Sequence, residues 1–495
     1  MRSTFHGIEV SKRGLFAQQS ALNTTGHNIS NANTEGYSRQ RVNMQATTGL
    51  PYVGMFQTIE PGLLGTGVQA DSIQRLREEF LDIQYRNEYK RQGYWDARTE
   101  TLEKVEGIMN EPSDTGLQKV MDQMWQAWQD LAKDPTDTSA RAVVRERSKA
   151  VADTFNTTYK HLQEVQTDLD NVVNVKAMEI NSIGQQLASL NNQISNVVPH
   201  GYQPNDLYDQ RDVLLDKLSK LVDIKATQST AGMVNVTIEG RDFVTGITSQ
   251  PFAAVQNPLT GVSDLTLGGA AFTPTSGYMA GTLESRDQIV PNILKRLDVL
   301  AVNLTKEIND IHRAGVSLSD INNGTVQDLP FFVDTTALAG NAATKDYPKG
   351  ALNITINPEI TKSLDAIAAA KPEATSTPVG NNETALAIAS IKFKVLAAGT
   401  GQNDLAESST LDNYYRYTIS QLGVDAQEAT RNQANSEMLV GTVDNQRQSV
   451  SGVSIDDEMA EMVKYQHAYS ASARVMTSMD EILDKVINGM GRVGL

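Results

Sequence analysis

Residues 5–30 read FHGIEVSKRGLFAQQSALNTTGHNIS, and this stretch decides the fold. Large apolar residues occupy every seventh position in it, at Ile8, Leu15, Leu22 and Ile29. A strict repeat of seven is typical of a helix that buries only a narrow seam against a partner helix. Asparagine and glycine after residue 30 predict that the helix ends there.

The end of the chain carries a matching pattern. Its apolar residues again follow the repeat of seven, at Ile455, Met462, Tyr469, Met476 and Leu483, with Met459 between the first two. Ser454, with Asp457 three residues later, resembles a capping box and predicts where this helix begins. Two matched seams at opposite ends of the chain predict a pair of N- and C-terminal coiled-coil helices.

The middle of the chain is mainly helical in pattern. Apolar residues step by three and four from 144 to 197 and predict one very long helix, which ends before Pro199. Shorter helices are predicted over 73–89, 117–131, 206–222, 289–311 and 411–443. In the second of these, Trp125 and Trp128 share one face, which favours a role in the core.

Two segments break this pattern with glycine, threonine, asparagine and short alternating runs, which favour strands. The predicted fold is therefore mainly α with inserted β-rich domains, in a nested multidomain architecture whose terminal helices are paired. The predicted domains are the terminal helices at 1–40 and 451–495, a discontinuous helical domain at 41–230, 282–314 and 405–450, a β-rich insertion at 231–281, and a β-rich or mixed outer insertion at 315–404.

Composition excludes several classes of protein. The formal charge of −16 argues against a surface for nucleic acid or anionic membrane, because both are polyanions. The chain has no cysteine, which excludes disulfides and thiolate chemistry. The N-terminus has no Sec-type signal, and no apolar run reaches transmembrane length. One basic run, Arg141, Arg145, Arg147 and Lys149, is interpreted as a solvated helix face.

Catalytic signatures are missing from the sequence. The six histidines lack metal-ligand spacing, and no nucleophile elbow or phosphate loop is present. Residues 65–70, GTGVQA, match a relaxed dinucleotide pattern, but Pro61 and Gly62 stand where a buried strand is required. A turn or tight strand is the favoured interpretation. We therefore expect no catalytic residue, no bound cofactor and no metal site.

Two terminal stretches resemble a known family. Residues 28–39, NISNANTEGYSR, resemble the N-terminal motif of the axial proteins of the bacterial flagellum, and residues 451–459, SGVSIDDEM, with 465–473, YQHAYSASA, resemble their C-terminal motif. The motif positions are Asn28, Asn31, Asn33, Thr34, Gly36, Tyr37, Tyr465, Gln466 and Tyr469. Residues 204–212, PNDLYDQRD, and GTGV at 65–68 with Arg75 beyond resemble the hook-associated protein 1 group in particular.

This resemblance implies a structural subunit at the junction of hook and filament, outside the cell. It implies export through the flagellar type III channel, a homo-oligomeric tubular assembly, contacts with the hook protein and the adjacent hook-associated protein, and an export chaperone on the C-terminal helix. The ten seam residues, Ile8 to Ile29 and Ile455 to Leu483, are the predicted assembly interface. No nucleic-acid or membrane partner is expected.

The seams themselves favour a need for further partners. Each seam residue gains roughly 1.5–3 kcal/mol on burial, whereas each ordered residue costs roughly 1–2 kcal/mol of backbone entropy. We therefore expect the terminal helices to be largely disordered in the monomer and to order on assembly. The alternatives are an ordinary helical hairpin within one chain, an extracellular adhesin or surface antigen, and a cell-wall hydrolase associated with the flagellum.

Overall fold

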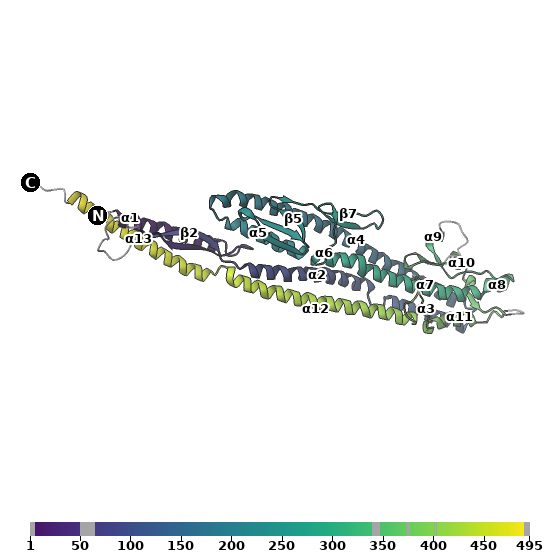
Figure 1. Ribbon diagram of the computed structural model, residues 1–495. Coiled ribbons are helices and arrows are strands. Elements are labelled where there is room, and N and C mark those ends of the chain that lie inside the picture. The colour runs from purple at the N-terminus through teal and green to yellow at the C-terminus, as the bar shows by residue number, and fades with distance from the viewer. Residues whose placement is uncertain are drawn as a thin grey trace, which may run out of the picture.

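The computed structural model describes residues 5–49, 65–338, 347–373, 377–399, 401 and 403–489. The molecule is long and narrow, and its first and last helices lie side by side at one end (Figure 1). We call this end the terminal arm. It consists of the helices α1 (His6–Ser30) and α13 (Ile455–Gly489) and the strands β1 (Gln40–Ala46) and β2 (Val68–Arg75). Residues 31–39, between α1 and β1, are the motif loop, and the rest of the described chain is the body.

Helices run along most of the body. They are α2 (Glu79–Met109), α3 (Leu117–Lys133), α4 (Thr138–Val197), α5 (Asn205–Leu221), α6 (Gly277–Glu284), α7 (Val290–Ala314), α8 (Leu318–Asn323), α9 (Thr335–Leu338), α10 (Pro358–Lys362), α11 (Glu383–Ser390) and α12 (Leu411–Ser451). A π-helical turn, η3 (Ser285–Ile289), links α6 to α7. Short 3-10 turns are η1 (Val198–His200), η2 (Thr230–Gly232), η4 (Ala351–Asn353), η5 (Leu364–Ala366) and η6 (Ile391–Phe393).

The strands form small antiparallel sheets. One has the order β3 (Ile224–Gln228), β4 (Val234–Ile238), β5 (Arg241–Thr245) and β6 (Thr248–Ser249), and a second has β7 (Phe252–Gln256), β8 (Ser263–Leu267) and β9 (Ala270–Ala271). Three strand pairs complete the set: β1 with β2, β10 (Val316–Ser317) with β13 (Ala368–Ala370), and β11 (Phe332–Asp334) with β12 (Ile354–Ile356). No strand therefore joins the arm to the body by sheet pairing within the described ranges.

Two clusters of buried apolar side chains hold the body together. One lies between α4, α5 and the sheets of β3–β9, around Phe243 and Leu218. The other fills the end far from the arm, where Trp128 and Trp125 are buried as predicted and Trp128 packs on Phe331. None of the described residues of α1 or α13 belongs to either cluster. The arm is therefore held mainly by other contacts.

The predicted fold class is confirmed: long helices dominate, small sheets are inserted, and the terminal helices pair. The long helix is α4, with 60 residues. The domain boundaries stay a prediction, and the first inserted sheet already begins with β3 at Ile224, ahead of the predicted boundary at 231, because β3 pairs with β4. Within the helix predicted over 73–89, Ile73 is instead in β2, where it pairs with Val42, and α2 begins at Glu79.

The prediction of a solvated basic face is wrong for Arg141. Its guanidinium is buried and donates hydrogen bonds to three backbone carbonyls, those of Pro135 (2.9 Å), Leu364 (3.2 Å) and Ile367 (2.8 Å). Burial lowers the pKa of Arg141. Arg147 and Lys149 are exposed, as expected. The acceptors for Arg141 come largely from a segment more than two hundred residues away, which the local sequence does not reveal.

Of the residues 65–70, for which a turn or tight strand was predicted, 68–70 open strand β2 and 65–67 lie just before it. Gly67 has φ = +110° and is followed by β2, which begins at Val68. A Cβ on Gly67 would lie 3.5 Å from the backbone of Val10, so the hairpin passes close to α1 at this point.

Candidate assembly surface

The helices α1 and α13 pack antiparallel in a repeat of seven. A Cβ on Gly7 would lie 3.1 Å from Met479, and one on Gly14 would lie 3.2 Å from Ser472 Oγ. Further along, the Asn28 side chain bonds to Glu458 at 3.0 Å. These contacts step by seven, or multiples of seven, forward along α1 and backward along α13. Small residues therefore let the two helices approach closely.

The predicted seam residues of α1 lie beside this contact. Ile8, Leu15, Leu22 and Ile29 are only partly buried, whereas the fully buried positions of α1 are small or polar: Ser11, Ala17, Ala21, Thr24, Thr25 and Asn28. The period of seven is as predicted, but the face nearest α13 is shifted by one residue. The four large side chains keep part of their apolar surface uncovered.

The predicted seam residues of α13 divide into two groups. Leu483 is buried, and Met462 and Met476 are partly buried, on the side facing α1. The exposed group is Ile455, Met459 and Tyr469, together with Val463, Val475, Ile482, Val486 and Ile487. A helix with so many exposed large apolar side chains has a surface suited to a protein partner. The role of all ten seam residues in assembly stays a prediction.

Asn28 organises the polar base of the arm. Its Nδ2 donates to the Gln40 carbonyl (2.9 Å) and to Glu458 Oε2 (3.0 Å), and its Oδ1 accepts from the Gln40 amide (3.0 Å) and the Tyr37 hydroxyl (2.8 Å). All four hydrogen-bonding positions of this buried amide are satisfied. Arg39 Nε donates to the other oxygen of Glu458 at 2.6 Å. One side chain therefore links α1, β1 and α13.

The motif residues after Asn28 form a tight connection. Asn31 Nδ2 donates to the His27 carbonyl at 3.0 Å, and Asn31 Oδ1 accepts from the Thr34 hydroxyl at 3.2 Å. Asn33 and Thr34 are exposed. Gly36 has φ = +77°, and a Cβ there would lie 2.0 Å from Val213 Cγ2. Only glycine fits this position, because both the conformation and the space exclude a side chain.

Tyr37 and Tyr465 show how the surroundings affect the other motif residues. Burial, and then the nearby carboxylates beginning with Asp206, raise the pKa of Tyr37. Burial and a hydrogen bond with Glu461 raise the pKa of Tyr465 to about 12. Both phenols therefore stay neutral and able to donate. Gln466 is exposed.

Helix α5 carries the carboxylates that tie the arm to the body. Asp209 accepts from the amide (3.0 Å) and hydroxyl (2.8 Å) of Ser38, and from Arg75 Nη1 (2.7 Å). Asp212 is surrounded by Arg75, Arg77 and Arg86. Burial alone would raise the pKa of the Asp212 carboxyl, but the arginines, Arg77 first, outweigh it and hold the pKa below its usual value.

We call these polar contacts between the arm and the body the joint. Further ion pairs extend the joint to α2 and α12. Arg77 makes a two-pronged pair with Asp82, at 2.7 and 2.9 Å. Asp216 pairs with Arg86 and with Arg447 of α12, whose guanidinium lies 4.0 Å from the centre of the Tyr85 ring. Mutual pairing in a partly dry site makes each member costly to remove. The joint is therefore specific in its geometry although it is almost entirely polar.

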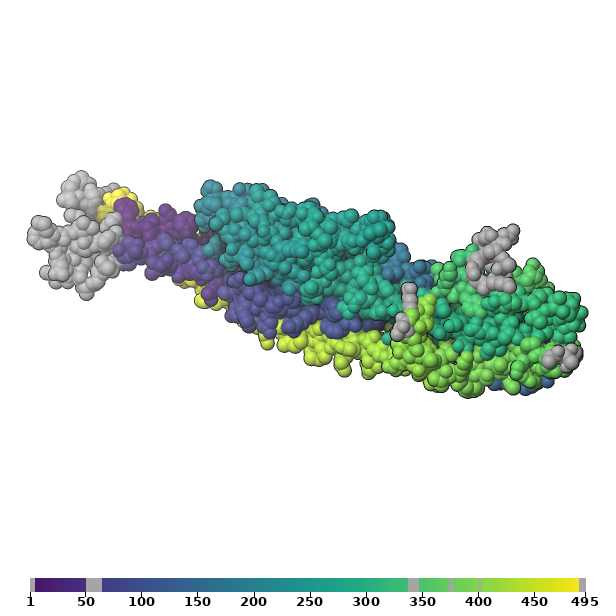
Figure 2. Space-filling view, turned by 45° about the vertical axis from the view of Figure 1, so that its right-hand side comes forward, coloured from purple at the N-terminus to yellow at the C-terminus, as the bar shows by residue number. Residues whose placement is uncertain are grey.

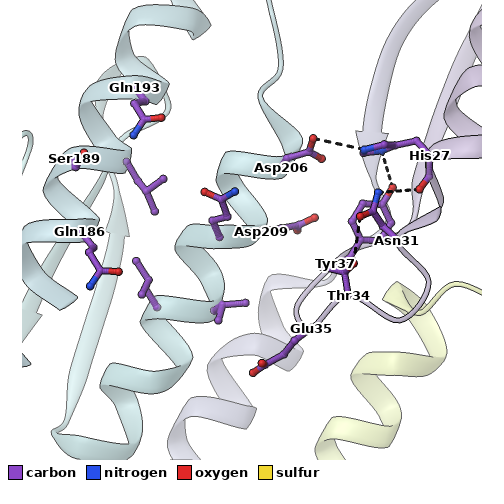
Figure 3. Close-up of a pocket in the computed structure, with 14 residues that line it drawn as sticks. His27, Asn31, Thr34, Glu35, Tyr37, Gln186, Ser189, Gln193, Asp206 and Asp209 are labelled. Atoms are coloured by element: carbon purple, nitrogen blue, oxygen red, sulfur yellow. Dashed lines mark hydrogen bonds and ion pairs between the residues drawn. The ribbon is translucent and has the colours of Figure 1, made fainter. Parts of the chain in front are cut away.

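A cleft of about 610 Å³ lies between the motif loop and the body. Figure 3 shows His27, Asn31, Thr34 and Tyr37 on one side of it and Gln186, Ser189 and Gln193 of α4 on the other, with Asp206 and Asp209 of α5 between them. His27 Nε2 lies 3.8 Å from Asp206. Among the residues described, no group of histidine, aspartate or glutamate is arranged to hold a metal ion.

The sequence motifs contain most of these residues, but they do not reveal which residues bond to them. Glu458 and Asp209 stand inside the motifs that carried the resemblance, but nothing local indicates that they bind Asn28 and Ser38. Gly7 and Gly14 were missed because glycine contributes nothing to an apolar repeat. Their spacing of seven, one residue before Ile8 and Leu15, is the signal that could have found them.

Comparison with known proteins follows the same division of the chain. The family model described as flagellar hook-associated protein FlgK helical domain matches residues 102–332. Models described as flagella basal body rod protein and flagellar basal body rod FlgEFG protein C-terminal match residues 8–37 and 445–489. Flagellar hook-associated protein 1 of Bacillus subtilis is 38% identical over 525 residues, covering 99% of both chains. The chain belongs to the flagellar hook-associated protein 1 family.

More distant members of the hook-associated protein 1 family are also similar over their whole length. The Escherichia coli protein is 26% identical over 553 residues, covering 97% of this chain and 99% of its own. The solved structure of the flagellar hook junction protein FlgK from Burkholderia pseudomallei has the same fold, with a TM-score of 0.60, 16% identity, and coverage of 76% of this chain and all of that one. The chain is thus a flagellar protein, and no helix in its described parts is long and apolar enough to span a membrane.

Proposed function

We propose that the chain is a structural subunit that joins the flagellar hook to the filament and polymerises through its terminal arm. The single observation that carries the proposal is the apolar surface left open on the paired helices α1 and α13. Phe16 on α1 and Ile482 on α13 are both more than half exposed. Further copies of the arm, packed side by side, would bury this surface in an inner tube. The joint would set the angle of each body relative to its arm.

The ordering of the arm would depend on this burial. The arm contributes no side chain in its described part to the two apolar clusters of the body, so much of its stability comes from polar contacts and a small-residue seam. We infer that α1 and α13 open readily in the monomer and become stable only in the assembly. The body would then contact the hook protein on one side and the adjacent hook-associated protein on the other.

The test is incorporation of variants with a charge on the arm. Ile482→Asp should leave the body folded and prevent incorporation at the junction, because it places a charge on an open apolar face. Leu15→Asp and Leu483→Asp should do the same. Leu259→Asp is the matched control, since Leu259 is 93% exposed in the β7–β8 connection of the body. Normal incorporation of Ile482→Asp, scored on isolated flagella, would contradict the proposal.

The route out of the cell is a further part of the proposal. A subunit of the external flagellum suits export as an unfolded chain through the flagellar channel. The exposed apolar side chains of α13 would then require a chaperone beforehand. A chain truncated after Ser451 should not copurify with that chaperone, whereas the full chain should. Retained binding by the truncated chain would count against this part alone.

The two alternatives from other classes gain no support. A cell-wall hydrolase needs a placed carboxylate in a substrate cleft, and the carboxylates along the cleft beside the motif loop include Asp209, which Ser38 and Arg75 engage. An adhesin role would need a ligand surface on the outer insertion. Family membership favours a structural subunit over both, and no catalytic role is proposed.

A further inference from the structure

One face of α12 is left open along the body. The helix buries Leu411, Tyr415, Leu422, Ala429 and Val440 on its inner side, against α2 and the far core. On the opposite side Val424, Met438 and Leu439 are 57%, 69% and 48% exposed, and Tyr417 is 60% exposed although the Arg296 guanidinium of α7 lies 5.5 Å from the centre of its ring. Figure 2 shows this helix along the lower edge of the molecule with no other element over it. Residues 417, 424 and 438 differ by multiples of seven and so form a single row along the helix.

Beside this row, α12 has two glycines at positions where no contact within the described chain requires a glycine. A Cβ on Gly423 or Gly441 would meet no atom within 4 Å. Each glycine costs roughly 0.5–1 kcal/mol relative to alanine in a helix. Large side chains in one row next to gaps in the adjoining row form a ridge and a groove, which is the surface on which a second helix packs.

The positive charge of Arg431 indicates what kind of helix would pack against this row. Arg431 occupies the same row and is exposed, and its side chain makes no hydrogen bond or ion pair with the residues that the structure describes. The chain carries 59 aspartate and glutamate residues, so another copy offers carboxylates to this arginine. Tyrosine, methionine and arginine are also the residue types enriched at protein interfaces.

The position of α12 points to the same partner. After Ser451, only three residues separate α12 from α13, and Figure 1 shows the two helices following one edge of the molecule. The open row on α12 therefore continues the apolar surface of the arm that the proposed function uses. We propose that the outer face of α12 packs against a helix of a second copy of this chain, so that lateral contacts extend from the arm along the body. This inference rests on the proposed function.

The direct test is photocrosslinking in assembled flagella. Benzoylphenylalanine at position 424 or 438 should give a product of about twice the mass of the chain, with peptides of this chain on both sides of the link. Met178 on α4 is the control position, because it is 65% exposed and lies on another helix. The absence of this product at 424 and 438 in flagella that contain the labelled chain, or a link to a different protein, would overturn the proposal.

A second test fills the groove without harming the helix. Gly423→Gln with Gly441→Gln replaces two glycines by a good helix former, so the monomer should be at least as stable to heat as the unchanged chain. Its incorporation should fall at least tenfold. Gly107→Gln in α2 is the matched control, since a Cβ there also meets no atom within 4 Å. Normal incorporation of the double variant contradicts this inference and leaves the proposed function standing, whereas normal incorporation of Ile482→Asp contradicts the proposed function itself.

Discussion

Asn28 and Glu458 are joined by a buried hydrogen bond of 3.0 Å, although 430 residues separate them in the chain. Both side chains are almost fully covered, and Glu458 also accepts from Arg39 at 2.6 Å. Few other contacts in the arm fix α1 against α13 so specifically. The two ends of the chain are therefore matched by polar geometry as well as by apolar surface.

The first prediction concerns this contact. Glu458→Gln keeps an oxygen for Asn28 but presents an amide group to Arg39 Nε, which loses its charged acceptor. The expected cost is about 1–3 kcal/mol of local stability, so amide exchange in α1 and α13 should accelerate by roughly tenfold to a hundredfold. Hydrogen-exchange mass spectrometry of the chain in isolated hook–filament junctions measures this, because the arm of the free monomer is expected to exchange rapidly already. Glu9→Gln in α1 is the control, because its ion pair with Arg13 is solvent-exposed and such pairs contribute roughly 0–1 kcal/mol. Equal exchange in the two variants would refute the role of Glu458.

A second prediction separates two costs of a side chain at Gly36, the clash with Val213 and the strain of a positive φ. Gly36→Ala adds a Cβ against Val213 in a backbone with φ = +77°. Gly201 has φ = +84° and open space, so Gly201→Ala should cost only the conformational part, about 1–2 kcal/mol. Gly36→Ala should destabilise the joint by clearly more, and Val213→Ala in the same chain should restore part of the difference. Protease susceptibility of residues 31–39 reports the result. Identical behaviour of the two alanine variants would show that Val213 does not matter.

A third prediction follows from the buried guanidinium of Arg141. Lysine cannot reach three carbonyls with the geometry of arginine, so Arg141→Lys should destabilise the contact of α4 with residues 364–367 by about 2–4 kcal/mol. Exchange at residues 364–370 should increase, while the terminal arm should be unaffected. Arg147→Lys on the same helix is the control, since Arg147 is exposed. An unchanged exchange pattern in Arg141→Lys would be inconsistent with this role.

A fourth prediction concerns pH and His312. The backbone amide of Ala368 donates to His312 Nε2 at 2.9 Å, and Nδ1 lies 2.7 Å from the Leu329 carbonyl, which fits a neutral ring. Burial lowers the pKa of His312 from 6.5 to about 4. Below pH 6.5 the unfolded chain therefore binds a proton that the folded chain does not, and stability falls as the pH drops toward 4. The loss between pH 6.5 and 5 should be about 2 kcal/mol.

The measurement for His312 is urea unfolding followed by tryptophan fluorescence, because Trp128 packs on Phe331 and Phe331 packs on His312. His312→Gln should be less stable at neutral pH, but its stability should depend less steeply on pH between 6.5 and 4. A variant with the same pH dependence as the unchanged chain would rule out His312 as the titrating group.

Local periodicity was sufficient to predict much of this fold. The steps of three and four in α4, the sevenfold repeats at the ends and the alternation in β4 each reflect one face of one element. Contacts between distant polar residues were not predictable in the same way. Arg141 was misassigned because its acceptors at 364 and 367 leave no mark near it in the sequence. The seam of α1 was placed on Ile8 and Leu15 because the glycines that face α13 carry no apolar signal.

The most direct test of the central claim compares amide exchange of the purified monomer with that of the chain in isolated hook–filament junctions. The claim is that the arm becomes stable by packing against other copies. It predicts rapid exchange of α1 and α13 in the monomer, protection of both by at least a hundredfold in the junction, and unchanged protection of α4. Equal and strong protection of α1 and α13 in both states would contradict it, because the two helices would then already be stable within one chain.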